Sequence, residues 1–308
     1  MKYFSSDFKY DKKLKKKGSG VMHGEIESKP LIYTKYLNWY YGNNHILRDI
    51  HLKFQKGEFI TILGPNGSGK TTLLRNITTA LKPGKGTVFL KGRDILSYSN
   101  RELARNMAVV PQNTHIDFEF SILDIVLMGR QVYLERFEDE GPEDMEVARR
   151  AMEYTNTWDL RDRPVTQLSG GEMQRVLIAR ALAQEADVLI MDEPVSHLDI
   201  YHQIEILNLI KMLQVKEKLT VISVLHDLNL ASQYSDHIVL LKDGYVKSKG
   251  SPYEVITEKN IEDVYGVEVC MIKHPRTGLS YVIPVNDTNQ RLKDHKDTKS
   301  MARFNLIK

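Results

Sequence analysis

Short apolar runs of strand length recur along the middle of the chain and alternate with stretches of helical periodicity. Four or five consecutive apolar residues between glycine, proline or charged residues are typical of a buried strand. Apolar residues three and four positions apart instead indicate one face of a helix. The strands predicted in this way comprise residues 59–63, 87–90, 188–191, 220–224 and 238–241. Because helical patterns separate most of these runs, we predict an α/β fold in which helices cover a parallel sheet.

Helical periodicity dominates one long stretch, between about residues 96 and 167. Apolar residues after Ile122 lie at helical spacing, and a second stripe runs from Glu143 to Tyr154. These patterns predict a helical insertion within the α/β core. Elsewhere, an apolar stripe over residues 73–81 and a second helical pattern over 203–213 predict helices that alternate with the strands.

Charge is distributed unevenly along the 308 residues, although 43 Lys and Arg against 40 Asp and Glu give a net charge of only +3. Residues 1–30 carry +4 and residues 287–308 carry +3, so the body between them carries −4. A slightly acidic body argues against a strongly basic nucleic-acid binder, and we expect no nucleic-acid partner.

Other features of the composition narrow the class of protein. The single cysteine, Cys270, excludes a disulfide framework and a multi-thiolate metal site. The N-terminus has no apolar stretch typical of a signal peptide, and no window reaches the roughly 18 apolar residues of a membrane helix. We therefore expect a globular protein of the cytosol.

A glycine-rich loop follows the first of the predicted buried strands and precedes a helix. It reads G-x-x-x-x-G-K-[ST], a pattern in which backbone N–H groups and a helix N-terminus cradle phosphate oxygens. We expect Lys70 to reach the β- and γ-phosphates of a nucleotide and the Thr71 hydroxyl to coordinate Mg²⁺. The candidate phosphate-binding residues are Gly64, Pro65, Asn66, Gly67, Ser68, Gly69, Lys70, Thr71 and Thr72.

Two acids, Asp192 and Glu193, follow the apolar strand 188–191 directly. A parallel strand delivers such residues to the carboxyl edge of its sheet, where open α/β sheets bind ligands. We expect Asp192 to hold Mg²⁺, usually through water, and Glu193 to polarise the attacking water.

A third motif opens the helix that follows Leu168. Ser169 is a good N-cap, whereas Gly170 and Gly171 are poor residues for a first helical turn. Their cost is explained if bare backbone N–H groups approach an anion closely.

Together, the glycine-rich loop, the sequence LSGGE and the strand that ends in Asp-Glu-Pro resemble the ABC ATPases over about residues 31–285. The resemblance implies a P-loop NTPase cassette with a parallel-sheet core, a small antiparallel β subdomain and the helical subdomain at about 96–167. It leaves residues 1–30 as a basic N-terminal tail and residues 286–308 as a polar C-terminal tail. The Lys-rich N-terminal tail could contact anionic lipid, although a merely solubilising role is the simpler interpretation.

The resemblance also implies roles for residues that would be unremarkable alone. Tyr41 matches the aromatic residue that stacks on adenine, with Tyr40 as the alternative. Gln112 matches the glutamine that senses Mg²⁺, Asp199 the loop that crosses the dimer interface, and His226 the histidine that contacts the γ-phosphate.

By the same resemblance, two copies of the chain close head-to-tail around two ATP molecules, so that Ser169 and Gly171 cap the partner's γ-phosphate. Catalysis would then rest on positioning and charge, from Lys70, Mg²⁺, Gln112, Glu193 and His226.

Sequence stretches around residues 127–137, 224–237 and 250–267 are similar to the importers of ferric siderophores, haem and cobalamin. This implies a separate integral membrane permease, an associated substrate-binding protein and a position at the cytoplasmic face of the membrane. The alternatives are an importer of zinc, manganese or another solute, and a non-transport ABC ATPase. We expect residues 113–135 to form the groove for the permease, with Phe118, Phe120 and Tyr133 as its contacts.

Overall fold

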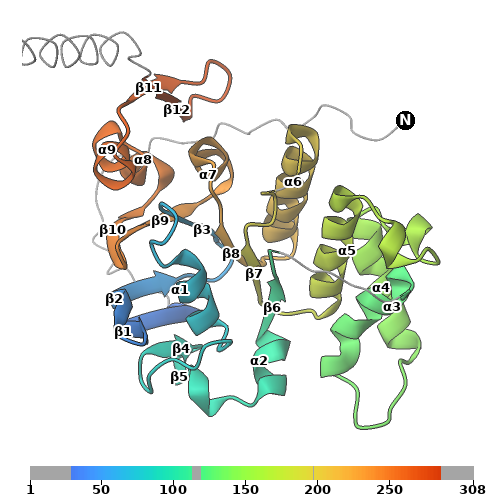
Figure 1. Cartoon of the computed structure of the whole chain (residues 1–308). Coiled ribbons are helices and arrows are strands. Elements are labelled where there is room, and N and C mark those ends of the chain that lie inside the picture. Colours follow the sequence, from blue (N-terminus) through green and yellow to red (C-terminus); the bar gives the residue numbers. More distant parts are fainter. Residues whose placement is uncertain (1–28, 113–118, 197, 286–308) are drawn as a thin grey trace, which may run out of the picture.

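The computed structural model describes residues 29–112, 119–196 and 198–285, which form three sheets surrounded by helices (Figure 1). The two predicted tails lie outside these residues, apart from positions 29 and 30. None of the described helices combines the length and the apolar character that a membrane span requires.

The central sheet has six strands in the order β10-β9-β3-β8-β7-β6, all parallel except β10. Its parallel strands are buried on both faces, which explains why they read as continuous apolar runs. The predicted strands 59–63 and 220–224 are confirmed without change, and the others within one residue at each end. The strands are β3 (Phe59–Leu63), β6 (Met107–Val110), β7 (Val188–Asp192), β8 (Thr220–Val224), β9 (His237–Lys242) and β10 (Tyr245–Gly250).

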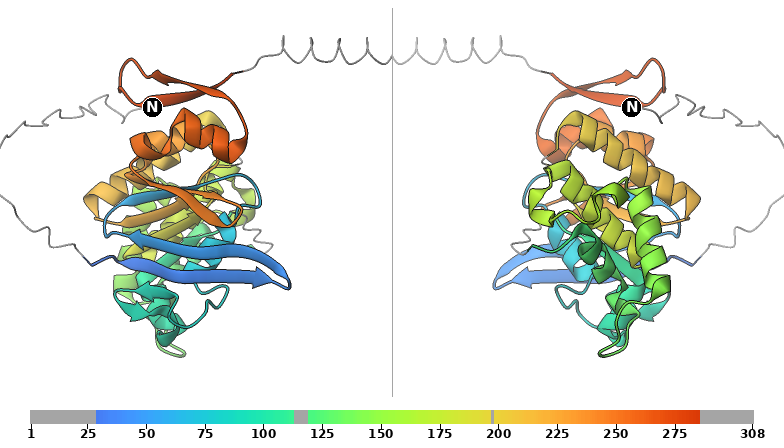
Figure 2. Two further views of the ribbon diagram at one scale, coloured as in Figure 1. Left: turned by 90° about the vertical axis from the view of Figure 1, so that its left-hand side faces the viewer. Right: turned by 90° about the vertical axis from the view of Figure 1, so that its right-hand side faces the viewer.

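An antiparallel sheet covers one face of the central sheet, as Figure 2 shows in side view. It contains β1 (Ile32–Tyr41), β2 (Asn44–Phe54), β4 (Val88–Leu90) and β5 (Arg93–Asp94) in the order β2-β1-β4-β5. Helix α1 (Lys70–Ile77) packs into the same core. The sequence prediction for this helix was too long: Thr79 takes a left-handed φ of 60°, and the N–H of Leu81 bonds back to the carbonyl of Arg75, which ends the helix.

Helices cover the opposite face of the central sheet. They are α5 (Gly170–Ala183), α6 (Ile200–Lys216), α7 (Leu228–Tyr234), α8 (Pro252–Val255) and α9 (Glu258–Tyr265). A two-stranded ribbon of β11 (Val269–Lys273) and β12 (Ser280–Pro284), which the sequence did not predict, packs on α7 and α9. The apolar side chains of this face form one continuous core.

A separate helical group lies beside the sheet, where α3 (Ile122–Leu127) and α4 (Pro142–Tyr154) pack on α5 around a core of their own. Short 3₁₀ turns connect them: η2 (Met128–Val132), η3 (Trp158–Leu160) and η4 (Val165–Gln167). The span 96–167 is not purely helical, because it includes β6 of the central sheet.

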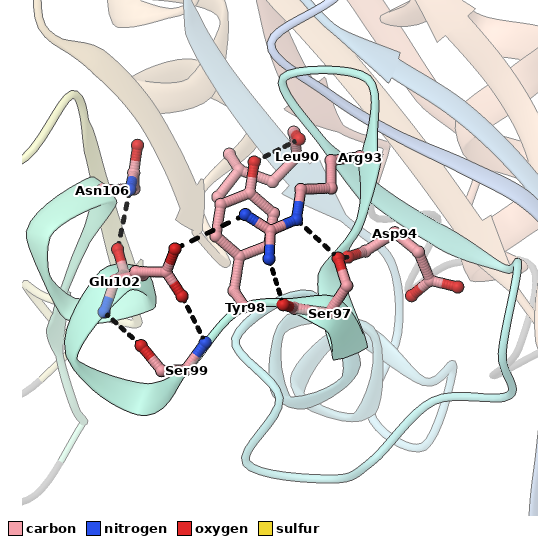
Figure 3. A network of polar contacts seen from close by, with 8 residues as sticks. All are labelled: Leu90, Arg93, Asp94, Ser97, Tyr98, Ser99, Glu102 and Asn106. Carbon is pink, nitrogen blue, oxygen red and sulfur yellow. Dashed lines mark hydrogen bonds and ion pairs between the residues drawn. The ribbon is translucent and has the colours of Figure 1, made fainter.

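A polar network fixes the connection from the antiparallel sheet through η1 (Ile95–Ser97) to α2 (Asn100–Asn106) (Figure 3). The Arg93 guanidinium donates to Ser97 and Glu102 and lies 4.3 Å from the centre of the Tyr98 ring. Ser99 and Glu102 form a reciprocal cap at the start of α2. The network therefore fixes the start of α2, the helix that directly precedes β6.

Candidate functional site

The predicted catalytic side chains converge at the carboxyl edge of the central sheet. Loop 64–69 follows β3 and Gln112 follows β6. Asp192 ends β7, Glu193 comes next, and His226 follows β8. Because these four strands are parallel neighbours, their carboxyl ends lie along one edge, where such sheets bind ligands.

Glu193 is held between two side chains from neighbouring strands. Gln112 Nε2 donates to Glu193 Oε2 at 2.6 Å, and His226 Nε2 lies 2.5 Å from Glu193 Oε1. The Glu193 side chain is only 14% exposed. Its backbone has a left-handed φ of 53° and donates its N–H to Val224 O at 3.2 Å. This conformation costs a non-glycine residue about 1–2 kcal/mol, so the surrounding contacts hold the carboxylate in a strained, defined position.

Lys70 is buried and directs its ammonium group into the glycine-rich loop. It donates to the carbonyls of Gly64 and Pro65 at 2.8 and 2.9 Å. Burial lowers the pKa of Lys70, and the nearby carboxylates of Glu193 and Asp192 oppose this shift. The carboxylates thus help to keep a cation at a position where burial alone disfavours it.

The loop itself leaves no room for other residue types at Gly64. Its φ is 150°, and a Cβ there would lie 2.2 Å from the carbonyl oxygen of Leu241. Gly69, the N-cap of α1, has a φ of 101° and gives the helix no side-chain cap. The first N–H groups of the helix, from Lys70 to Thr72, therefore face the loop, which suits them to bind phosphate oxygens.

The remaining loop residues differ in exposure. Asn66 and Gly67 are exposed at its tip, whereas Ser68 is buried and its hydroxyl has no hydrogen-bond partner among the described residues. An unpartnered buried hydroxyl is uncommon, and its place in a loop of this type fits a site that binds a polar ligand.

Oxygen donors suited to Mg²⁺ lie next to the loop. Thr71 Oγ1 donates to Asp192 Oδ1 at 3.3 Å. Burial raises the pKa of Asp192, the Glu193 charge adds to the rise, and the bond from Thr71 opposes it. The described residues contain no group of three or more His, Cys, Asp or Glu that could hold a metal ion. These donors therefore fit Mg²⁺ only if phosphate and water oxygens complete its coordination.

Of the two candidate aromatic residues, Tyr40 already has a stacking partner. Its ring lies 4.0 Å from that of His45, nearly parallel. Tyr41 is 44% exposed and meets Trp39 at 78°, an edge-to-face contact. The end of the β1–β2 hairpin also approaches the phosphate loop, since a Cβ on Gly69 would lie 2.9 Å from Leu47. Tyr40 is the more exposed of the two, at 53%, so both tyrosines stay candidates for stacking on a flat ligand group.

The Ser169 motif lies on the other face of the sheet. Helix α5, which Ser169 caps, packs in the core opposite to that of α1. Ser169 and Glu172 form a reciprocal cap. The hydrogen bond from the Ser169 backbone N–H to the Glu172 carboxylate is the main cause of the lowered pKa of Glu172. Gly170 and Gly171 start the helix, and a Cβ on Gly171 would lie 2.8 Å from the His202 ring. Close packing therefore gives a second reason for this glycine, which the sequence did not indicate.

The loop before α6 presents a surface that the sequence interpretation missed. Asp199 caps α6 and binds the His202 ring at 3.0 Å. The next two residues, Ile200 and Tyr201, are 78% and 70% exposed. Two large apolar residues in succession after the predicted interface residue were the available signal.

The expected permease groove is only partly within the described residues, since 113–118, including Phe118, lie outside them. Phe120 is 39% exposed. Tyr133 instead donates its hydroxyl to Gln184 O at 3.0 Å and lies under the buried Arg130 guanidinium. A groove of about 700 Å³ lies nearby, between α2, β6, η2 and α5, with Leu103, Val109, Met128, Gln131 and Arg180 among its lining residues.

Comparisons with known proteins identify the family of the chain. The family profile of the ABC transporters matches residues 47–196. The chain is 39% identical to the probable siderophore transport system ATP-binding protein YusV of Bacillus subtilis, over 82% of this chain and 92% of that protein.

Two solved structures share the fold. One is assigned to the metal-chelate type of ABC transporter and was solved in an inward-facing conformation. It is 28% identical with a TM-score of 0.74, and the match covers 84% of this chain and 99% of that chain. The other is the dimeric ATP-binding cassette MJ0796 in a post-hydrolysis state with ADP and Pi, which is 29% identical with a TM-score of 0.63 over 72% and 98%. The chain therefore belongs to the ABC transporter family, as one of its ATP-binding subunits.

Proposed function

We propose that the chain hydrolyses ATP to power the uptake of a metal chelate, namely a ferric siderophore, haem or cobalamin, through a separate membrane permease. The observation that carries the catalytic part is the clamp on Glu193, held by Gln112 and His226 beside the phosphate loop. The names of the siderophore and metal-chelate relatives support the solute class. An importer of zinc, manganese or another solute is the second candidate, and a non-transport ABC ATPase the third.

In this proposal, Glu193 orients a water molecule against the γ-phosphorus of ATP and accepts its proton as the bond to the ADP oxygen breaks. Lys70 exchanges its loop carbonyls for phosphate oxygens, and His226 donates to the γ-phosphate. Thr71, Gln112 and Asp192 would hold Mg²⁺, which would supply positive charge to the phosphates. Most of the catalysis is therefore positioning and charge stabilisation.

The nucleotide site is completed by a second copy of the chain. Because α1 and α5 pack on opposite faces of the sheet, Ser169 and Gly171 are suited to cap nucleotide held by a partner. The exposed Ile200 and Tyr201, beside Asp199, provide apolar surface for the same head-to-tail contact. The dimeric relative with ADP and Pi supports this arrangement.

The groove beside α5 is the proposed docking site for the permease, at the cytoplasmic face of the membrane. Arg180 is the only charged residue among the described ones that line it, and burial lowers its pKa with no described carboxylate to oppose the shift. An acidic side chain or a helix carboxyl end of the permease would pair with it. Residues 31–285 would form the cassette, and the tails 1–30 and 286–308 would lie outside it.

Reconstitution of the chain with candidate importer permeases tests the proposal. We expect copurification, and ATPase activity stimulated by a substrate-binding protein loaded with ferric siderophore, haem or cobalamin. Stimulation by zinc- or manganese-loaded protein alone would move the assignment to the second candidate. ATPase activity that no permease stimulates but that ribosomes or DNA ends do stimulate would overturn the transport assignment.

A further inference from the structure

The C-terminal ribbon is attached to α7 through the side-chain amide of Asn229. Its Oδ1 accepts the backbone N–H of Val282 at 2.7 Å, and its Nδ2 donates to the Val282 carbonyl at 3.3 Å. One amide therefore satisfies both backbone groups of a strand residue, as a neighbouring strand would. One turn further along α7, Ser232 Oγ donates to Ser280 O at 3.3 Å. Figure 1 shows the ribbon above α7, at the end of the described chain.

The ribbon is part of the core and not a loose appendage. Val282 and Val269, one from each strand, are buried in the same apolar cluster as Ala231 of α7. On its other side, α7 is tied to the sheet, where Ser235 Oγ and Thr61 Oγ1 lie 2.6 Å apart. The helix is thus fixed from two directions, by the sheet and by the ribbon.

The residue that binds the ribbon lies in the first turn of α7, and Asp227 fixes the start of that helix. Asp227 caps the helix, and its Oδ1 accepts the backbone N–H of Asn229 at 2.7 Å and that of Leu230 at 2.9 Å. His226 is the residue before this cap and follows Leu225, which is 2% exposed. The backbone of His226 is therefore set on one side by the sheet and on the other by the first turn of α7.

We propose that Asn229 is a positioning residue for ATP hydrolysis, which holds His226 against Glu193 by fixing α7 to the C-terminal ribbon. The proposal rests on the proposed catalytic role of His226. The contact between the His226 and Glu193 side chains is 2.5 Å long, so a small displacement of α7 breaks it. Misplacement of a catalytic group by about 1 Å is enough to cost up to about 100-fold in rate.

The first experiment compares Asn229→Ala with a matched control in the full-length chain. Asn260→Ala removes a similar half-buried amide, which donates to Val255 O at 2.8 Å within the C-terminal part and does not bond to α7. We expect Asn229→Ala to lower kcat by about tenfold and to leave the Kd for ATP within about twofold. Asn260→Ala should leave kcat unchanged. Ser232→Ala loses one weaker contact with the ribbon and should lower kcat less than Asn229→Ala does. It also tests the proposal if Asn229→Ala does not fold.

A double-mutant cycle separates positioning from a merely structural role. In a His226→Ala background, single-turnover hydrolysis should fall by less than about twofold on adding Asn229→Ala, because the residue that Asn229 positions is absent. The NMR signal of the His226 imidazole should shift in Asn229→Ala and stay in place in Asn260→Ala.

The outcomes distinguish this inference from the proposed function. If His226→Ala hydrolyses ATP at the wild-type rate, the catalytic assignment of His226 is wrong. If His226→Ala is slow but Asn229→Ala is as fast as wild type, or if both substitutions act independently in the cycle, only the positioning role is overturned.

Discussion

The buried pair between Arg130 and Asp144 tests how the helical group is held together. The Arg130 side chain is 5% exposed, and its Nε donates to Asp144 Oδ1 at 2.9 Å. Its Nη1 donates to Glu185 Oε2 and to Ala183 O, both at 2.8 Å. The guanidinium carbon also lies 4.1 Å from the centre of the Tyr133 ring. Arg130 therefore joins η2 to α4 and to the end of α5.

We expect Arg130→Met, which keeps the length of the side chain but removes its charge and donors, to lower the free energy of unfolding by about 3 kcal/mol at pH 7. Removing one partner of a buried pair costs about 3–5 kcal/mol because the other charge stays buried without compensation. The side chain of Asp144 is 12% exposed, so water compensates it only in part. Adding Asp144→Asn to Arg130→Met should recover part of the loss, since the stranded charge is then gone.

Urea denaturation followed by circular dichroism measures the change, with Arg149→Ala as control. The Arg149–Glu153 pair has the same 2.9 Å separation, but both side chains are more than 50% exposed, and we expect no measurable loss. If Arg130→Met is no less stable than Arg149→Ala, burial does not determine how much these ion pairs contribute to stability, and the expected loss of about 3 kcal/mol is refuted. A charge reversal at Arg130 would likewise report on folding, so it is unsuitable as a test of permease docking.

Four further predictions concern the site and its surroundings. Glu193→Gln should bind ATP normally but hydrolyse it about 100-fold or more slowly, and accumulate as a dimer in size-exclusion chromatography; wild-type phosphate release would contradict its role. Gly64→Ala should abolish ATP binding or destabilise the chain in thermal melts, since its Cβ meets a carbonyl, whereas Gly67→Ala, with open space, should do less. Arg180→Met should raise the melting temperature of the isolated chain, by removing a desolvated charge that has no carboxylate partner among the described residues, yet weaken permease copurification; the opposite pattern would refute the docking role. Arg130 lowers the pKa of Asp144, so this pair contributes stability that is fully present above about pH 4 and is lost as pH falls through the folded-state pKa; urea titrations of Asp144→Asn should lack this loss.

Three residues of the catalytic edge were predictable because they follow apolar strands closely, at the ends of β7 and β8. An apolar run both identifies such a strand and locates its carboxyl end, so Asp192, Glu193 and His226 could be placed together before any coordinates. The match to family motifs then supplied their expected roles, which stay predictions.

The β1–β2 hairpin was not predictable from periodicity for a physical reason. Its pairing shifts register three times between Thr34 and Tyr40, and Tyr36 and Asp49 have left-handed φ values of 51° and 54°. Each bulge reverses which side chains face the core, so strict alternation of apolar and polar residues is lost. The C-terminal ribbon was not predicted for a different reason. Its two strands are short and only one face of each is covered, so the apolar pattern is weak.

Helix α5 contributes to two cores, and this has a mechanical consequence. Leu177 and Ala181 pack beneath the central sheet, whereas Val176 and Ala179 pack in the helical group. A helix packed on both sides moves as a rigid body with its neighbours, because close-packed interiors do not deform continuously. Ser169 caps its start, and Arg180 lines the proposed permease groove eleven residues later, about 16 Å along the axis. Under the proposed docking, a permease that displaces Arg180 displaces Ser169 with it, so transport and the closing of the partner's nucleotide site would be coupled through one helix.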